Sequence, residues 1–386
     1  MTAMADPARC VDPSLGADSM REALLACASN TVPVTLARRD VAGVPIYAAA
    51  DLLRADRRQV FDELVAVLRR GAGVFVVESA VAAEAVRRVS LAFDAIIERE
   101  RSAAAPAGDH FAPAGANSRI WNALEKLADS DPEAFCEYYE SPAIALAAEA
   151  WLGPWYQVTS QVNVVHPGGA AQQPHCDFHL GFQYDADIAR FPAHVHALSP
   201  MLTLQGAVAH CDMPVATGPT TYLPHSQKLP AVYSSWRRAD LIAAYSEMSV
   251  SIPLGLGDAV FFNPSLLHAA GTNQTTDVHR MANLLQISSA MGRAMESVDR
   301  AHMSRVIYPS LCARRDSGWS ADALSRVVAA SSEGYPFPTN LDRDQPIGRL
   351  TPPSQAEVVL DALLSGADSI ELTAALVDHD QRRRTR

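Results

Sequence analysis

The sequence has almost no lysine. Lys126 and Lys228 are the only two, so arginine carries nearly all of the positive charge. Charged residues make up 19% of the 386 residues, and the formal net charge is −11. Outside the arginine-rich stretch 381–386, which we interpret as a frayed tail, the chain lacks the basic stripe with which proteins follow a phosphate backbone. A nucleic-acid partner is therefore disfavoured.

Cysteine pairs and long apolar runs are also missing. The six cysteines form no C-x-x-C pair, which argues against a zinc finger, a thioredoxin-type motif or a disulfide framework. The chain has no run of 18 apolar residues, the length that a membrane-spanning helix needs. The first 15 residues lack the basic and then apolar order of a secretory signal. We therefore expect a cytoplasmic protein without a membrane partner, present as a monomer or a homodimer.

Local patterns divide the chain into three parts. Residues 1–50 are rich in small residues and weakly periodic, and we expect a leader arm of uncertain order. The apolar spacing in 56–70 predicts an amphipathic helix, followed by a buried strand over 74–77 and a helix that Ser79 caps and that runs to Ile97. The Ala-, Pro- and Gly-rich stretch 103–116 predicts a loop. Residues 291–386 return to helical periodicity and are interpreted as a C-terminal extension packed on the domain formed by 51–290.

The middle of the chain has the character of a β-sandwich or barrel. Short apolar runs separated by Pro- and Gly-rich turns are typical of such folds. The expected strands are 156–165, 201–210, 250–254, 259–262 and 280–289. The fold class predicted is thus a mostly β core with flanking helices.

Two segments 93 residues apart carry the strongest chemical signal. The first, PHCDFH, separates His175 from Asp177 by one residue; the second, GDAVFFNPSLLHAAG, places His268 just beyond an apolar strand. In an extended backbone the side chains of His175 and Asp177 point to the same side. Two imidazoles and one carboxylate are the ligands of a facial-triad site for non-haem Fe(II), which leaves coordination positions open for chemistry.

The same triplet occurs a second time, so the pattern alone is ambiguous. His210-Cys211-Asp212 repeats the His-Cys-Asp sequence of the first segment. His210 ends an apolar strand that runs into Asp212-Met213-Pro214, where an aspartate commonly serves a turn. We therefore favour His175 and Asp177 as metal ligands.

An arginine twelve residues after His268 suggests that the site also binds an anion. Arg280 opens an apolar strand, where a buried guanidinium is costly without a negative partner. A dicarboxylate co-substrate gripped by the guanidinium fork satisfies it, and a structural ion pair with a protein carboxylate is the alternative. Thr159, Gln161 and Asn163 share one face of an apolar strand and are further candidates to bind an organic acid.

In order along the chain, four pieces resemble the phytanoyl-CoA dioxygenase family of Fe(II)/2-oxoglutarate-dependent oxygenases. They are GAGVFVVESAV with the helix before it, PHCD, the turn TGPTTYLPHSQK, and GDAVFFNPSLLHAAG with Arg280. The resemblance implies a double-stranded β-helix, or jelly roll. It also implies Fe(II) on His175, Asp177 and His268, 2-oxoglutarate on Arg280, and O2 as oxidant. The turn departs from the family's Pro-Gly-Ser-His, because His225 and Gln227 replace its glycine and histidine.

The resulting hypothesis is a dioxygenase that hydroxylates a small or medium organic metabolite, with succinate and CO2 as co-products. Desaturation, epoxidation or cyclisation by the same iron centre is one alternative, and a catalytically silent jelly-roll binding protein is another. By position in the sequence, the substrate pocket is expected to include Arg119, Trp121, Phe178, His179, Phe182, Gln205 and Asn283. A purely structural hydrogen-bonding role stays open for Gln205 and Asn283.

Overall fold

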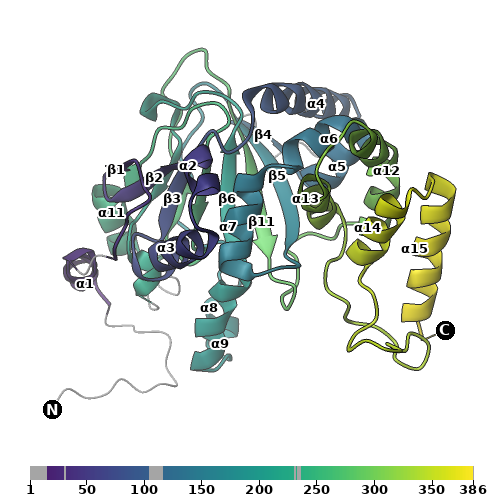
Figure 1. Ribbon diagram of the computed structural model, residues 1–386. Helices are drawn as coiled ribbons and strands as arrows, with labels where there is room; N and C mark the ends of the chain where they lie inside the picture. The colour runs from purple at the N-terminus through teal and green to yellow at the C-terminus, as the bar shows by residue number, and fades with distance from the viewer. Residues whose placement is uncertain (1–14, 30–31, 104–115, 230–231, 233–235, 386) are drawn as a thin grey trace.

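Two β-sheets flanked by helices form the protein in the computed structural model (Figure 1), which describes residues 15–29, 32–103, 116–229, 232 and 236–385. The larger sheet has eight strands in the order β1-β2-β3-β9-β6-β11-β5-β4, and the smaller has three in the order β10-β7-β8. The strands of the larger sheet are β1 Arg39–Val41, β2 Val44–Ala48, β3 Val74–Glu78, β4 Asn117–Ile120, β5 Gln157–Val165, β6 Thr203–Ala209, β9 Ala259–Phe262 and β11 Arg280–Ser288. Those of the smaller are β7 Thr220–Tyr222, β8 Val250–Ser251 and β10 His268–Ala270.

This arrangement confirms the predicted jelly-roll core with flanking helices. Every strand pair is antiparallel except β2 with β3. The sheets do not close into a continuous barrel, and one cavity has walls from both of them. The predicted strand at 259–262 agrees with β9, and the expected strands at 156–165, 201–210 and 280–289 agree with β5, β6 and β11 within two residues at each end.

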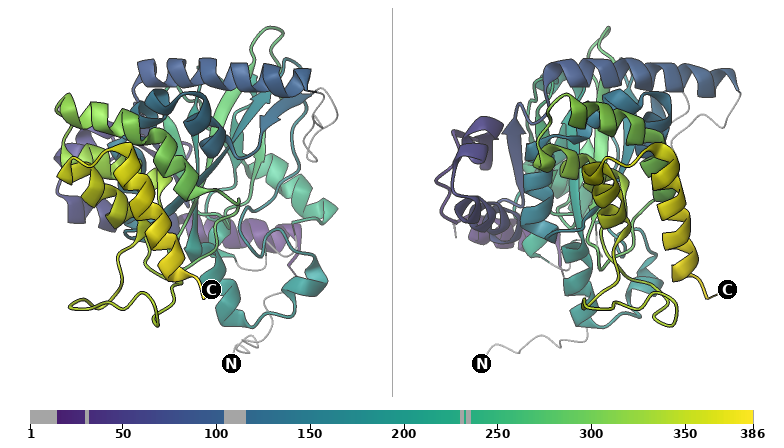
Figure 2. Two further views of the ribbon diagram at one scale, coloured as in Figure 1. Left: turned by 90° about the vertical axis from the view of Figure 1, so that its right-hand side faces the viewer. Right: turned by 45° about the vertical axis from the view of Figure 1, so that its right-hand side comes forward.

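Helices cover one face of the large sheet (Figures 1 and 2), and residues on the other face line the cavity. Their buried side chains form one core with the strands, in which Phe93 and Tyr138 of two helices pack together with Leu285 and Ile287 of β11. The described helices are α1 Ala17–Ser29, α2 Ala49–Arg54, α3 Arg57–Arg70, α4 Ala83–Ser102, α5 Ala123–Ser130, α6 Pro132–Tyr139, α7 Pro142–Leu152, α8 Asp185–Ile188, α9 Ala193–Leu198, α11 Ala239–Met248, α12 Arg300–Asp316, α13 Ala321–Ser331, α14 Gln355–Ser365 and α15 Ser369–Arg383. Of these, α1, α8, α9 and α11 do not belong to this core and pack in a separate apolar cluster that includes Ala269 of β10. Strands β5 and β11 are thus buried on both faces, by helices on one side and by the cavity on the other.

The entry segment matches its prediction except at the two ends of α4, which begins later than expected and ends at Ser102 and not at Ile97. Helix α3 follows Asp56, whose carboxylate accepts a hydrogen bond from the backbone N–H of Gln59, as an N-cap residue does. Ser79 does not cap the next helix. It has a positive φ of 53°, and α4 begins only at Ala83. The backbone N–H of Ser79 instead donates to the carboxylate of Asp258, which fixes a turn between β3 and the helix.

Part of the expected leader arm belongs to the sheet. Within 1–50, Val44–Ala48 is a fully buried strand that pairs in parallel with β3. The short run VPIYA has too few residues to show a period, and its partner lies about thirty residues further along the chain, so only the tertiary contact reveals it. The expected loop 103–116 lies almost wholly outside the described residues. None of the described helices is long and apolar enough to cross a membrane.

Candidate active site

His175, Asp177 and His268 come together at one side of the cavity. The Nε2 atoms of His175 and His268 lie 3.6 Å from Oδ1 and Oδ2 of Asp177, respectively. One ligand atom from each of the three residues lies within 4.8 Å of the others. This donor set, two imidazole nitrogens and one carboxylate, is the one that facial-triad iron sites use. The three predicted ligands are therefore adjacent in space, although they come from distant segments.

Backbone contacts fix both imidazole rings in one tautomer. Nδ1 of His175 lies 2.8 Å from the carbonyl oxygen of Gln173, and Nδ1 of His268 lies 2.9 Å from that of Leu266. A carbonyl oxygen only accepts, so Nδ1 carries the proton in each ring. The lone pair is then on Nε2, which faces Asp177. Metal-binding histidines are oriented in this way by their outer partners.

The carboxylate of Asp177 is held in its charged form. Burial acts to raise its pKa, but the imidazoles of His175 and His268, when they are also protonated on Nε2, outweigh burial and keep the pKa well below the usual range. Burial acts to lower the pKa of His175, yet Asp177 outweighs it and the net pKa is raised. A metal cation that binds between these groups would take the place of the Nε2 protons and face the same carboxylate.

The cavity has a volume of about 340 Å³ and is lined from both sheets. Strands β5, β6, β9 and β11 supply one wall, and β7 and β10 supply the other. Much of the lining is apolar, as is usual for small-molecule sites; it includes Ala207, Ile252, Leu254, Val260, Phe262 and Leu284. The ring of Phe262 packs on that of His268, with centroids 4.7 Å apart, and so shields the metal-ligand side of the cavity from water.

Arg280 lines the same cavity and has no negative partner. The residue is only 4% exposed, and its side chain makes no ion pair or hydrogen bond within the described part of the chain. Burial lowers the pKa of its guanidinium to about 10, against the opposing effect of Cys211 and Tyr222, so it remains a cation at neutral pH. The alternative of a structural ion pair with a protein carboxylate finds no support among these residues. A buried, unpaired guanidinium calls for an anionic ligand.

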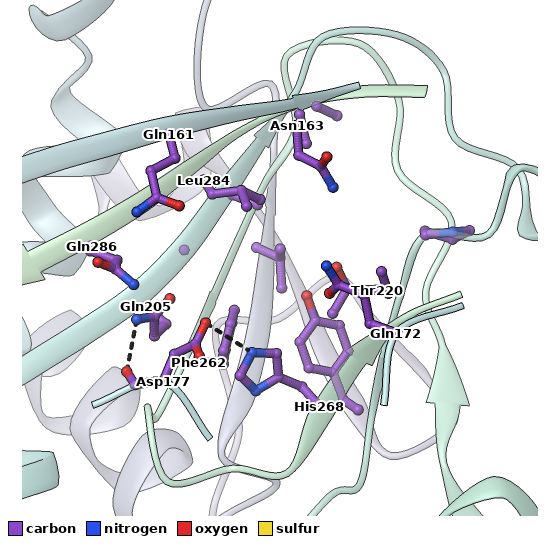
Figure 3. Close-up of a pocket in the computed structure, with 18 of the residues that line it drawn as sticks. Gln161, Asn163, Gln172, Asp177, Gln205, Thr220, Phe262, His268, Leu284 and Gln286 are labelled. Carbon is purple, nitrogen blue, oxygen red and sulfur yellow. Dashed lines mark hydrogen bonds and ion pairs between the residues drawn. The ribbon is translucent and has the colours of Figure 1, made fainter. Parts of the chain in front are cut away.

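The other candidate residues divide between the cavity and the protein interior. Six of them line the cavity, while four do not. Besides the ligands and Arg280, the cavity is lined by the predicted Arg119, Trp121, Gln161, Asn163, Phe182 and Gln205. Figure 3 shows Asn163 on the far side of the cavity from Gln161 and Gln205. Gln161 and Asn163 therefore lie at different ends of the cavity, although they share one face of β5.

Thr159, Phe178, His179 and Asn283 are corrections, because none of them lines the cavity. The Thr159 hydroxyl donates to the carbonyl of Gln286, and Phe178 is fully buried in a separate apolar cluster. Nε2 of His179 bonds the carbonyl of Arg293. The Asn283 amide donates to the hydroxyls of Tyr138 and Tyr139 on the helical side of β11. Asn283 is an odd number of residues from Arg280, and strand alternation therefore turns it to the opposite face.

Four polar residues of the cavity were missed by the sequence analysis: Gln172, Thr220, Tyr222 and Gln286. Gln286 could have been found, because it lies six residues after Arg280 on the same strand and must share its face. Thr220 and Tyr222 lie on β7, which is three residues long and too short to show which face is buried.

His210 is a structural residue, as its strand context predicted. Its Nδ1 lies 2.9 Å from the Ser90 hydroxyl and its Nε2 lies 2.9 Å from the Tyr138 hydroxyl, on the helical side of the sheet. Burial lowers its pKa to about 3. The carboxylate of Asp212 accepts from the backbone N–H of Leu256 and so serves a turn. The second His-Cys-Asp triplet is thus separate from the cavity.

Comparison with known proteins agrees with this geometry. The family model for phytanoyl-CoA dioxygenase (PhyH) matches residues 70–282, more than half of the chain. The chain belongs to the phytanoyl-CoA dioxygenase family. It is therefore a non-haem iron enzyme that depends on 2-oxoglutarate and acts on a small molecule, with Fe(II), 2-oxoglutarate and O2 as its cofactors and co-substrates.

Solved structures with a similar fold include enzymes of natural-product biosynthesis, and no curated protein sequence matches the chain. SnoN, a non-haem α-ketoglutarate-dependent epimerase from nogalamycin biosynthesis, is 22% identical over 60% of this chain and 82% of its own, with a TM-score of 0.42. SnoK, the carbocyclase of the same biosynthesis, is 20% identical over 66% and 92%, with a TM-score of 0.43. AviO1 from Streptomyces viridochromogenes Tue57 is 18% identical over 62% and 98%, with a TM-score of 0.43.

The turn that contains His225 and Gln227, where this chain departs from the family, is hydrogen-bonded to the residue before His268. His225 replaces the family's glycine and keeps a glycine-like positive φ of 72°, a conformation that costs energy for other residues. Its Nδ1 lies 2.9 Å from the carbonyl oxygen of Gly71, which offsets part of that cost. Gln227 donates to the same carbonyl. Between them, the Ser226 hydroxyl accepts from the backbone N–H of Leu267, next to His268.

Proposed function

We propose that this enzyme hydroxylates a small or medium organic molecule, with Fe(II) held by His175, Asp177 and His268 and 2-oxoglutarate held at Arg280. The observation that carries the proposal is the presence of both halves in one cavity: a correctly oriented His-Asp-His donor set and a buried guanidinium without a partner. Each half needs a ligand, and the family's two cofactors are a divalent cation and a dicarboxylate.

The donor set fits Fe(II) in both number and type. Two neutral imidazoles and one carboxylate on one side of a metal leave the remaining positions for the co-substrate and O2. When bound together, these groups supply oxidative decarboxylation of 2-oxoglutarate to succinate and CO2, with insertion of one oxygen atom into a substrate C–H bond. The residues of the chain supply the positions in which these molecules meet.

Arg280 fixes the distal end of the co-substrate. A guanidinium fork binds a carboxylate through two parallel hydrogen bonds, and the low-polarity surroundings of Arg280 strengthen that contact. Thr220 and Tyr222 of the smaller sheet and Asn163 of β5 offer further polar groups along the cavity. The apolar walls exclude water from the space between Arg280 and the metal ligands.

Desaturation, epoxidation and cyclisation place the same demands on these residues, and product analysis separates them from hydroxylation. Each of these reactions forms one equivalent of succinate. A hydroxylated or epoxidised product gains one oxygen atom, and NMR spectra tell the two apart because epoxidation consumes an alkene. Desaturation or ring closure removes two hydrogen atoms. The first test of the proposal needs no organic substrate. Anaerobic addition of Fe(II) and then 2-oxoglutarate should give a weak visible charge-transfer band, and its absence from folded protein would reject the site.

The setting of the enzyme follows from its chemistry. Ferrous iron and free thiols suit a reducing cytoplasm, and the five described cysteines, Cys27, Cys136, Cys176, Cys211 and Cys312, form no disulfide. We propose a cytoplasmic enzyme that is a monomer or a homodimer, which size-exclusion chromatography with light scattering tests directly.

A further inference from the structure

Three glutamine side chains gather on one side of the cavity, next to Asp177 (Figure 3). Gln161 comes from β5, Gln205 from β6 and Gln286 from β11, and all three line the cavity. Gln205 and Gln286 are direct partners in the register of β6 with β11, and side chains at such positions are neighbours on one face of a sheet. Figure 3 shows Asn163, Gln172 and Thr220 on the other side of the space.

Gln286 is buried and its amide is unused. The residue is 8% exposed and lines the cavity, and its side chain makes no hydrogen bond within the described ranges. Buried amides in native proteins are hydrogen-bonded as a rule, because they otherwise lose the bonds that water provides. An amide that faces a cavity without a protein partner is therefore poised for a ligand that both donates and accepts.

The other two glutamines are partly committed. Nε2 of Gln205 donates to the backbone carbonyl of Asp177 at 2.8 Å. Because a carbonyl only accepts, the nitrogen assignment is settled, and Oε1 is left as an acceptor without a described partner. Oε1 of Gln161 already accepts from Arg119 at 2.9 Å. The open groups are thus the whole amide of Gln286 and the Oε1 of Gln205, and Gln205 lies directly against a metal-ligand residue.

Arg280 and Gln286 lie toward opposite ends of the same strand. Arg280 and Gln286 are six residues apart on β11, which corresponds to roughly 20 Å along a strand at about 3.3 Å per residue. In the proposed function, 2-oxoglutarate extends from Arg280 toward the metal ligands. We therefore assign the glutamine side of the cavity, at the other end of β11, to the organic substrate.

We propose that Gln286 and Gln205 form a subsite for an uncharged, hydroxyl-bearing part of the organic substrate, beside the metal ligands. This inference rests on the proposed function. A hydroxyl group donates to one amide oxygen while it accepts from an amide N–H, whereas a carboxylate cannot donate and an ammonium cannot accept. Neutral amides offer no charge to offset the desolvation of an ion. The apolar wall around them suits the hydrocarbon skeleton that carries the hydroxyl.

Four probes with one carbon ring test the subsite: cyclohexanol, trans-cyclohexane-1,2-diol, cyclohexanecarboxylate and cyclohexylamine. The full-length enzyme is loaded with Mn(II) and 2-oxoglutarate, so that enhanced relaxation of probe protons reports binding near the metal without turnover. We expect the two alcohols to bind in preference to the two ions, and Gln286→Leu to weaken alcohol binding at least fivefold. Gln345→Leu, the same change at an exposed residue, should leave binding unchanged.

Gln286→Glu keeps the shape of the side chain and serves as the second variant if Gln286→Leu fails to fold. Its charge should also weaken binding of the alcohols. Three outcomes overturn the inference. The first is stronger binding of the carboxylate than of the alcohols, which would point to Arg119. The others are a preference for the alcohols that survives both variants, and the absence of any bound alcohol. The charge-transfer band with Fe(II) and 2-oxoglutarate separates the two proposals. If the band is present and the alcohol preference is absent, only the subsite is rejected; if the wild type has no band, the proposed function is rejected.

Discussion

The backbones of His175 and His268 are joined by a two-way bridge. The N–H of His175 donates to the carbonyl of His268 at 2.9 Å, and the N–H of His268 donates to that of His175 at 3.1 Å. The ring centroids lie 4.6 Å apart as a result. The spacing of two candidate ligands from distant segments is therefore set by main-chain hydrogen bonds, and it does not depend on the metal.

Loss of one imidazole should abolish the metal site. We expect His268→Ala to weaken Fe(II) binding at least 100-fold and to remove the charge-transfer band, because only one nitrogen and one carboxylate remain. His210→Gln should keep both, since His210 lies on the helical side of the sheet. Anaerobic titration with Fe(II) and 2-oxoglutarate measures both quantities. A His210 variant without the band, beside a His268 variant that retains it, would reverse the assignment.

Arg280→Met should separate co-substrate binding from folding. We expect 2-oxoglutarate to raise the melting temperature of the Mn(II)-loaded wild type through binding, and to have no such effect once the guanidinium is removed. The free energy of unfolding without ligands should stay within about 1 kcal/mol of the wild type or rise, because a buried charge without a partner is removed. Thermal and urea unfolding measure these effects.

The matched control for that variant is Arg300→Met. Arg300 is also buried, but its guanidinium donates to the backbone carbonyls of Ala330 and Val158. Its removal should lower the free energy of unfolding by about 1–3 kcal/mol, since buried acceptors lose their donor, while the stabilisation by 2-oxoglutarate remains. Equal responses of the two variants to 2-oxoglutarate would argue against the role of Arg280.

His210 should make the protein acid-sensitive. Burial lowers its pKa to about 3 in the folded state, whereas the unfolded state has an ordinary pKa near 6.5. Below pH 6.5 only the unfolded chain takes up this proton, so the free energy of unfolding falls as the pH decreases. Between pH 7.5 and pH 5 the loss should be about 2 kcal/mol. Urea unfolding of the wild type and of His210→Gln should show this difference in slope, and parallel pH profiles would contradict it.

Ser226 should stabilise the metal site through its hydrogen bond to the residue before His268. Its hydroxyl is the acceptor for the buried N–H of Leu267, so Ser226→Ala leaves that donor unsatisfied at a cost of about 1–3 kcal/mol. We also expect weaker Fe(II) binding, because His268 is the next residue. Ser265→Ala, in the same loop but bonded to Asn263, is the control, and it should leave Fe(II) binding unchanged. Equal metal affinity in the two variants would remove this role of Ser226.

The sequence predicted those strands and site residues whose positions depend on neighbouring residues in the chain. The metal-ligand segments, Arg280 and the strand at 259–262 follow from residue type, alternation and flanking turns, and the triad meets in space as expected. Asn283 was misplaced although alternation from Arg280 assigns its face, so that error was avoidable. The error at Thr159 could not be avoided in this way, because Thr159 shares the face of Gln161. Only its hydrogen bond to the neighbouring strand shows that its hydroxyl is not available to the cavity.

The start of the family match and the start of the fold do not coincide. The match begins at residue 70, but the large sheet begins at residue 39. Strand β1 is short, exposed and charged at Arg39 and Asp40, which is how natural sheets protect an edge from unwanted pairing. A fragment cut at residue 70 would leave the apolar strand β3 as an open edge, with the backbone groups that had paired with β2 exposed. Such a fragment should aggregate through that open edge, whatever the state of its metal site.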